Sequence, residues 1–279
     1  MAKSAKPDVI EKIFKDRWDP VTGSLSATVV SMADIAGAIR ELESPLSTDN
    51  LANFFKDIVR NTRRNANFPK SVVAAGYTAQ QAAGKGDKAV FEFVPLPTGA
   101  TEAFFEHTPS EESLESPTLV QSLSIPIEAR RLGREDESWL AQAVAELRLI
   151  ELHLAMHSKH KLVAVAHLMT NMKLGRGEID SMWRGEIENA LGDNESILIP
   201  AEMKSRKEVL ELEQVRRGAL AAAVEAERKL ERSGAVLPMA VKVLPNHLVW
   251  ILEFDMDFEE ELRIVSDAVY RPVPKVPGI

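Results

Sequence analysis

The sequence predicts an α/β protein of the α+β type, and three observations support this class. The run 197–204 is apolar until its charged end, and a helical segment follows it from about 207 to 232. Two further apolar runs, 239–243 and 248–254, predict neighbouring strands. A long helical stretch, 137–157, precedes all of these. Strands with helices before and after them are typical of a mixed sheet that helices cover.

The composition is that of an ordinary globular protein. The chain has 279 residues, enough for one large domain or two modest ones, with 45% apolar and 27% charged residues. It has no cysteine, which excludes a disulfide scaffold, a thiol nucleophile and a cysteine-based zinc site. Its start lacks the apolar core of a signal peptide, and no apolar stretch is long enough to span a membrane. We therefore expect a cytoplasmic protein without membrane association.

Residues 1–96 predict a compact helical unit that ends in a hairpin. Apolar residues recur with a helical period over 30–40, and a second helix is expected from Leu51 onward. Strands are expected at 71–77 and 89–94, with a basic turn between them. The order of elements is thus helix, turn, helix and hairpin.

The segment 56–88 is basic, although the whole chain carries a net charge of −8. It holds seven lysines and arginines against two aspartates, a net charge of +5. Phosphate contacts need local positive potential, and Arg and Asn side chains suit guanine and adenine edges. Together with the basic turn at 84–88, the element order resembles a winged helix-turn-helix domain over about residues 30–96, which implies double-stranded DNA as a partner. The alternative is a protein-interaction surface with a solvated basic edge. The residues expected on DNA are Arg60, Asn61, Arg63, Arg64, Asn65, Asn67, Lys70, Lys85 and Lys88.

Residues 97–127 are polar, acidic and interrupted by Pro and Gly, as expected of a linker. The sequence therefore predicts a DNA-binding domain at 1–96, a linker at 97–127 and a second domain at 128–279. At the end of the second domain, the Pro-rich segment 271–279 predicts a non-helical stretch that packs on the body of the protein or on a second subunit.

Three charged residues, Asp180, Glu202 and Lys204, stand out in the second domain. Side chains alternate along a strand, so Glu202 and Lys204 share a face, with Met203 opposite. Asp180 ends a short apolar-acidic segment before a polar turn. Burying an Asp, a Glu and a Lys together is unfavourable unless a hard divalent cation lies between the carboxylates. The alternative is an exposed Glu202–Lys204 pair on an edge strand, with Asp180 in a turn.

The spacing Asp-x21-Glu-x-Lys resembles the active-site signature of the PD-(D/E)xK nuclease superfamily, which has a restriction-endonuclease-like mixed-sheet core. The resemblance implies a type II-like restriction endonuclease that hydrolyses DNA phosphodiester bonds with one or two Mg²⁺ ions. It assigns Asp180, Glu202 and the backbone carbonyl of Met203 to the metal, and Lys204 to the reacting water or phosphate. Gln214, on the following helix, would bind a phosphate, hold Lys204 or face solvent. The residue before the Asp is isoleucine instead of the frequent proline, which leaves the carboxylate in place.

A further acidic ligand is expected from the helix 137–157. Glu151 falls on the same apolar stripe as Leu147 and Leu154, and a carboxylate on a core-facing stripe needs a partner. In the resembling fold, the helix before the first active-site strand often directs an acid toward the metal. Glu151 is therefore the candidate, ahead of Glu146, which lies off the stripe. Alternatively, Glu151 lies at the edge of the stripe and reaches water.

A histidine-based metal site is the competing interpretation of this region. His153, His157 and His160 recur at spacings of four and three residues, which can present imidazoles on one helix face. The sequence has no H-E-x-x-H pattern, and 157–161 is typical of a solvated helix end. We expect no zinc there.

Three functions follow from these patterns. The first is a sequence-specific DNA endonuclease, which we expect to be a homodimer because two strands need two cuts. The second is a structure-specific repair nuclease. The third is a non-catalytic winged-helix DNA-binding regulator, in which Asp180 and Glu202 are merely structural.

Overall fold

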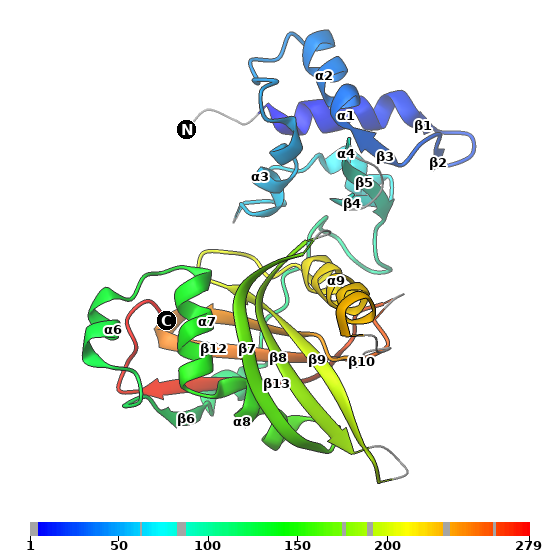
Figure 1. Ribbon diagram of the computed structural model, residues 1–279. Helices are drawn as coiled ribbons and strands as arrows, with labels where there is room; N and C mark the ends of the chain where they lie inside the picture. The colour runs from blue at the N-terminus through cyan, green and yellow to red at the C-terminus, as the bar shows by residue number, and fades with distance from the viewer. Residues whose placement is uncertain are drawn as a thin grey trace. The chain divides into compact units, whose positions relative to one another are not determined.

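The computed structural model describes residues 5–61, 63–82, 88–174, 177–188, 192–230, 235–258 and 261–279. The chain divides into two compact units, Met1–Glu106 and His107–Ile279, which are described separately (Figure 1). The division falls inside the predicted linker, 97–127. That segment is more than a linker, because it supplies helix α5 (Glu111–Glu115) and edge strand β6 (Thr118–Gln121) to the second unit. A strand this short shows no pattern that would distinguish it from a loop.

The first unit packs its helices against a three-stranded antiparallel sheet of order β3-β5-β4. Helix α2 begins with a capping box, in which Ser31 and Asp34 each accept a hydrogen bond from the other's backbone N–H. Phe55 and Phe91 stack in the core with ring centroids 4.9 Å apart. The elements are α1 (Lys6–Arg17), β1 (Trp18–Asp19), β2 (Ser24–Leu25), β3 (Val29–Ser31), α2 (Met32–Glu41), η1 (Leu51–Asn53), α3 (Lys56–Val59), α4 (Lys70–Ala74), β4 (Tyr77–Gln81) and β5 (Ala89–Pro95).

Two elements of the first unit differ from the prediction. The helix expected from Leu51 is split into η1 and α3, and the strand expected at 71–77 is helix α4 followed by β4. Pro69 caps α4 and fixes the backbone angle just before its first turn. The helix buries Val72 in the core of the unit. An apolar run this short does not distinguish helix from strand by its period.

The second unit is built on an eight-stranded mixed sheet of order β6-β13-β12-β11-β9-β8-β7, with β10 beside β9 (Figure 1). Strands β7, β8 and β9 are antiparallel neighbours, and β11 runs parallel to β9. Strands β11, β12 and β13 are again antiparallel, and β6 is parallel to β13. This sheet and its helices confirm the mixed α/β class. The remaining strands are β7 (Leu162–Leu174), β8 (Gly177–Glu188), β9 (Asn194–Lys204), β10 (Ala235–Val236), β11 (Met239–Leu244), β12 (Leu248–Phe254) and β13 (Ile264–Val273); the short helix η2 (Pro245–His247) joins β11 to β12.

Helices cover both faces of this sheet. Leu140 of α7 packs in the same apolar cluster as Met203. Val215 of α9 packs with Ala240, which pairs with Glu202 and therefore lies on the opposite face from Met203. In the part of the chain that the structure describes, no helix has the length and apolar character to cross a bilayer. The helices are α6 (Ile127–Leu132), α7 (Glu137–Glu146), α8 (Leu149–His157) and α9 (Leu212–Leu230).

The helix predicted over 137–157 is in fact two helices. Arg148 has a φ of 53°, in the left-handed region, and it separates α7 from α8. The residues of the predicted apolar stripe are nevertheless all buried in one cluster: Leu140, Val144, Leu147 and Leu154.

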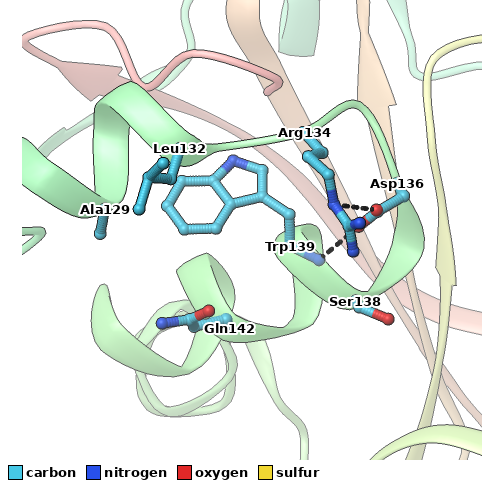
Figure 2. Close-up of a pocket in the computed structure, with 7 residues that line it drawn as sticks. All are labelled: Ala129, Leu132, Arg134, Asp136, Ser138, Trp139 and Gln142. Atoms are coloured by element: carbon cyan, nitrogen blue, oxygen red, sulfur yellow. Dashed lines mark hydrogen bonds and ion pairs between the residues drawn. The ribbon is translucent and has the colours of Figure 1, made fainter.

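The link between α6 and α7 borders a surface cavity of about 300 Å³ (Figure 2). Trp139 and Leu132 line it. The intervening Gly133 has little room, since a Cβ there would lie 2.8 Å from the ring of Trp139. Trp139 therefore holds the α6–α7 connection close to the body of the unit.

Candidate metal centre

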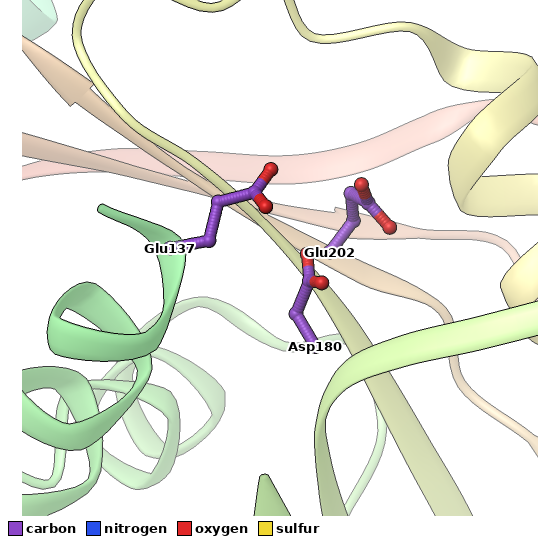
Figure 3. Close-up of side chains that lie close together, drawn as sticks. All are labelled: Glu137, Asp180 and Glu202. Atoms are coloured by element: carbon purple, nitrogen blue, oxygen red, sulfur yellow. The ribbon is translucent and has the colours of Figure 1, made fainter. Parts of the chain in front are cut away.

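Three carboxylates converge in the second unit and are called the carboxylate cluster below. Glu137, Asp180 and Glu202 each offer an oxygen, and these oxygens all lie within 4.8 Å of one another. Figure 3 shows the three side chains approaching from a helix end and from two strands. Residues far apart in the sequence are thus brought to one place by the sheet and by the helix before it.

Asp180 lies where β8 and β9 separate. Their pairing ends at Ser181 and Ala201, while β8 continues to pair with β7. The backbone N–H of Met203, two residues beyond the last paired residue of β9, donates to Oδ2 of Asp180 at 2.8 Å. The carboxylate therefore takes the place of a backbone acceptor that the neighbouring strand does not supply at this point. The same hydrogen bond holds the carboxylate in position.

Glu202 and Lys204 lie on the interior strand β9, between β8 and β11. Their side chains share a face, and Nζ of Lys204 lies 2.6 Å from Oε1 of Glu202. Each side chain is only 4% exposed. The alternative of a solvated pair on an edge strand is therefore wrong.

Glu137 is the member of the cluster that the sequence did not reveal. It is the first residue of α7, whose cap Asp136 accepts the backbone N–H of Trp139 at 2.8 Å. Oε1 of Glu137 lies 2.5 Å from Nζ of Lys204, so the ammonium bridges two carboxylates. The only available signal was the acidic start of the helical pattern, which is equally typical of ordinary helix starts.

The helix acid in the cluster is Glu137, and not Glu151 as the apolar stripe predicted. The helix breaks at Arg148, so Glu151 lies on a different helix from Glu137. Glu151 lies on α8, where its Oε1 is 3.8 Å from Nε of Arg148. Burial raises the pKa of Glu151 above its usual range, so this carboxylate is a half-buried group of its own.

Burial dominates the electrostatics of the cluster. It raises the pKa of Asp180 to about 6 and the pKa of Glu202 to about 7. The hydrogen bond from Met203 opposes the shift at Asp180, and the charge of Lys204 opposes it at both acids, without cancelling it. Burial also disfavours the charge of Lys204, but Glu202 and Glu137 outweigh it and hold the pKa of Lys204 above its usual range.

The donor set fits a hard divalent cation. Carboxylate oxygens are the ligands that Mg²⁺ prefers, and three of them converge here. One ammonium faces three carboxylates, and burial raises the pKa values of Asp180 and Glu202, so a bound cation would offset the cost of keeping these acids ionised. The structure thus places Asp180, Glu202 and Lys204 together and adds Glu137.

Met203 and Gln214 have less defined places at this site. Met203 contributes its N–H to Asp180, and the role of its carbonyl as a metal ligand stays a prediction. Gln214 lies half-buried in the first turn of α9. Among the hydrogen bonds of the described residues, none joins its side chain to the carboxylate cluster.

The histidines form no comparable group. In the described ranges, the one group of metal-ligating side chains that converges is the carboxylate cluster. His153 is fully buried, and its ring nitrogens lie 3.1 Å from the hydroxyls of Tyr270 and Ser266. Burial lowers the pKa of His153 to about 3, and the charge of His157 adds to this shift. His153 is thus a satisfied core residue.

Two of the residues expected on DNA are engaged within the first unit instead. Arg64 is 5% exposed, and its guanidinium donates to the carbonyl of Phe105 at 3.0 Å. The amide of Asn65 donates to the carbonyl of Phe104 at 2.9 Å and accepts the N–H of the same residue at 2.8 Å. The segment after β5 thus engages both side chains, and their contact with DNA stays a prediction. Of the others, Arg60, Asn61, Arg63, Lys70 and Lys88 are exposed, Asn67 is half-buried, and Lys85 lies outside the described residues.

Comparisons with known proteins add nothing to this picture: no family model, no curated protein and no solved structure matches the chain.

Proposed function

We propose that this protein is a magnesium-dependent DNA endonuclease of the PD-(D/E)xK type. The observation that carries the proposal is the convergence of the half-buried Asp180 with the buried Glu202 and Lys204, with Glu137 added to them. An exposed cluster of acidic side chains would not support a metal site, because such clusters are common on surfaces that bind no ion. Here Glu202 and Lys204 are buried, and Glu137 and Asp180 are half-buried beside them. Three carboxylates withdrawn from water around one ammonium are unfavourable for folding, and such arrangements are typical of sites that bind a cation.

The side chains of the site have separable tasks. Glu137, Asp180 and Glu202 would hold the metal, and Mg²⁺ when bound supplies positive charge to the phosphodiester oxygens that gain and lose bonds. Lys204 stays protonated at neutral pH, because its carboxylate neighbours hold its pKa above the usual range. This favours an electrostatic role for Lys204 at the phosphate, since a general base would need a lowered pKa.

The arrangement of both units is consistent with DNA as substrate. The acid of the first motif lies on β8, and the Glu-x-Lys motif lies on the adjacent strand β9, inside a mixed sheet with helices on both faces. In the first unit, helices α2 to α4 lie in the chain between β3 and the β4–β5 hairpin of the same antiparallel sheet, an order that supports a winged helix-turn-helix domain. The exposed Arg60, Arg63, Lys70 and Lys88 would give this domain its phosphate contacts.

A plasmid-cleavage assay tests the proposal. Supercoiled DNA should be cut in Mg²⁺ and not in EDTA, and Lys204→Ala and Asp180→Ala should each lower the rate about 10²-fold or more. Lys161→Ala is the control, because Lys161 is 71% exposed and pairs with Glu188. Discrete fragments would support a sequence-specific enzyme, and branch-specific cutting would support a repair nuclease.

Two other outcomes would reject the catalytic proposal or the site. Mg²⁺-independent binding without cleavage would leave a DNA-binding regulator as the function. Full cleavage by Lys204→Ala would show that the site lies elsewhere. A homodimer is part of the proposal for sequence-specific cutting, and light scattering of the free protein measures it.

A further inference from the structure

The Pro-rich segment after β13 returns to the start of α7. The indole N–H of Trp139 donates to the carbonyl of Pro277 at 2.8 Å. Val276 is fully buried, and Ile279 is 4% exposed. The sequence left open whether this segment packs on the body of the protein or on a second subunit. In the structure it packs on the body of its own unit. The first turn of α7 is therefore in direct contact with residues 276–279.

Gly278 brings the two stretches of backbone together. Its φ of +84° favours glycine, and a Cβ at this position would lie 2.5 Å from the carbonyl oxygen of Arg134. No side chain fits at that distance. The close approach thus depends on glycine, and it is made to a residue that lies three positions before Glu137.

The residues from Arg134 to Trp139 form one linked piece (Figure 2). Nε of Arg134 lies 2.8 Å from Oδ2 of Asp136, whose Oδ1 accepts the N–H of Trp139. Asp136 thereby caps α7, and Glu137 is the first helical residue after it. Glu137 then reaches out to Lys204 and the carboxylate cluster.

We propose that residues 276–279 are a positioning segment for Glu137 and thereby set the affinity of the carboxylate cluster for a divalent cation. The inference rests on the proposed function, because it assigns a role within the same site. Asp180 and Glu202 come from paired strands of the sheet, whose hydrogen bonds hold them. Glu137 comes from a helix end, which is held by its cap and by the contacts of Trp139 and Arg134 with the positioning segment.

Two variants loosen this contact, and each has a matched control. Trp139→Phe removes the hydrogen bond to Pro277. Its control is Trp250→Phe, which removes an indole hydrogen bond of the same length, 2.8 Å, to Asp267. Trp250 lies in the apolar cluster on the α9 face of the sheet. Gly278→Ala introduces the collision with Arg134. Its control is Gly192→Ala, which has the same unfavourable φ, +86°, but no atom within 4 Å of the added Cβ.

The measurement is Mn²⁺ binding without DNA, followed by electron paramagnetic resonance, since Mn²⁺ takes the same oxygen ligands as Mg²⁺. Trp139→Phe and Gly278→Ala should weaken Mn²⁺ binding about tenfold, the usual effect of losing an outer support of a metal ligand. The two controls should bind like the unaltered protein. When Glu137→Gln is already present, the positioning variants should cause no further loss, because they act through that carboxylate.

The outcomes separate this inference from the proposed function. Unchanged Mn²⁺ affinity in variants that fold and cleave DNA overturns the inference and leaves the function standing. The same tenfold loss in the Glu137→Gln background also overturns it, because the segment would then act by another route. Absence of Mn²⁺ binding in the unaltered protein overturns both. Urea denaturation of each variant shows that the compared proteins are folded.

Discussion

Oδ2 of Asp180 accepts the backbone N–H of Met203 at 2.8 Å, two residues beyond Ala201, where β9 stops pairing with β8. The same carboxylate belongs to the cluster that would bind the metal. Asp180 therefore has a structural task beside the chemical one that we propose, and different substitutions separate them.

Asp180→Asn should keep the fold and lose the function. The amide oxygen can still accept the N–H of Met203, and the substitution removes a buried charge, so the free energy of unfolding at pH 8 should be at least that of the unaltered protein. Asp180→Ala should be less stable than Asp180→Asn by about 1–3 kcal/mol, because it leaves a buried N–H without a partner. Urea denaturation gives both values, and both variants should fail to cleave. Equal stability of the two variants would contradict the structural task.

The metal-free protein should become less stable as the pH rises from about 4.5 to above 7. The folded-state pKa of Glu202 is about 7, above its ordinary value of 4.5, and that of Asp180 is raised to about 6. The folded state thus binds these protons more tightly. The stabilisation is fully present below the unfolded pKa values and is lost as the pH rises through the folded ones, at up to about 1.4 kcal/mol per pH unit for each group.

Thermal melts in EDTA at several pH values check this prediction. Glu202→Gln should reduce the loss of Tm between pH 5 and pH 8, because its amide does not titrate. Adding Mg²⁺ at pH 8 should restore Tm in the unaltered protein, since a bound cation stabilises the ionised carboxylates. A Tm that is independent of pH in EDTA would mean that these carboxylates are already compensated by other charges.

The short-range part of the site could be predicted from the sequence, and the long-range part only incompletely. Alternation along one strand places Glu202 beside Lys204 whatever the rest of the fold. Asp180 depends on the register of the β8–β9 hairpin, which the spacing suggested through a resemblance and not through geometry. Glu137 meets Lys204, 67 positions further along the sequence, because α7 packs beside β9, and no pattern within α7 reveals that contact.

The same limit applies to the basic segment of the first unit. Arginine and asparagine are chemically suited to DNA bases, and composition cannot tell whether another part of the chain already uses them. Arg64 and Asn65 meet Phe105 and Phe104, which lie about 40 positions further along the sequence. A partner at that separation becomes visible only when the fold is known.

Arg63 and Arg64 should therefore respond differently to substitution. Arg63 is exposed, so Arg63→Ala should leave the stability unchanged, weaken DNA binding, and lower the slope of log affinity against log salt by about 1. Arg64 is buried and bonded to Phe105, so Arg64→Ala should cost about 1–3 kcal/mol of the stability of the first unit. Salt-dependent binding and urea denaturation of both variants check this. An unchanged salt slope in Arg63→Ala would remove Arg63 from the DNA interface.

The last prediction concerns a chain of hydrogen bonds in the core of the second unit. The hydroxyl of Ser266 donates to Oε2 of Glu253 at 2.8 Å, so it must accept from Nε2 of His153. Nδ1 of His153 then accepts from the hydroxyl of Tyr270. Each hydroxyl and N–H proton of these hydrogen bonds therefore already has an acceptor, and the imidazole is held in its neutral form.

Protonation of His153 would therefore put a charge and a competing proton into a closed core. The folded-state pKa of about 3 lies below the ordinary value of 6.5, so the stabilisation is present above pH 6.5 and is lost as the pH falls toward 3. His153→Gln can keep one donor and one acceptor without titrating. Over this range the variant should therefore lose less stability than the unaltered protein, and the difference should grow by up to about 1.4 kcal/mol per pH unit. Urea denaturation of both proteins between pH 7 and pH 4 measures the difference. Parallel curves would show that His153 takes up its proton without disturbing Tyr270 and Ser266.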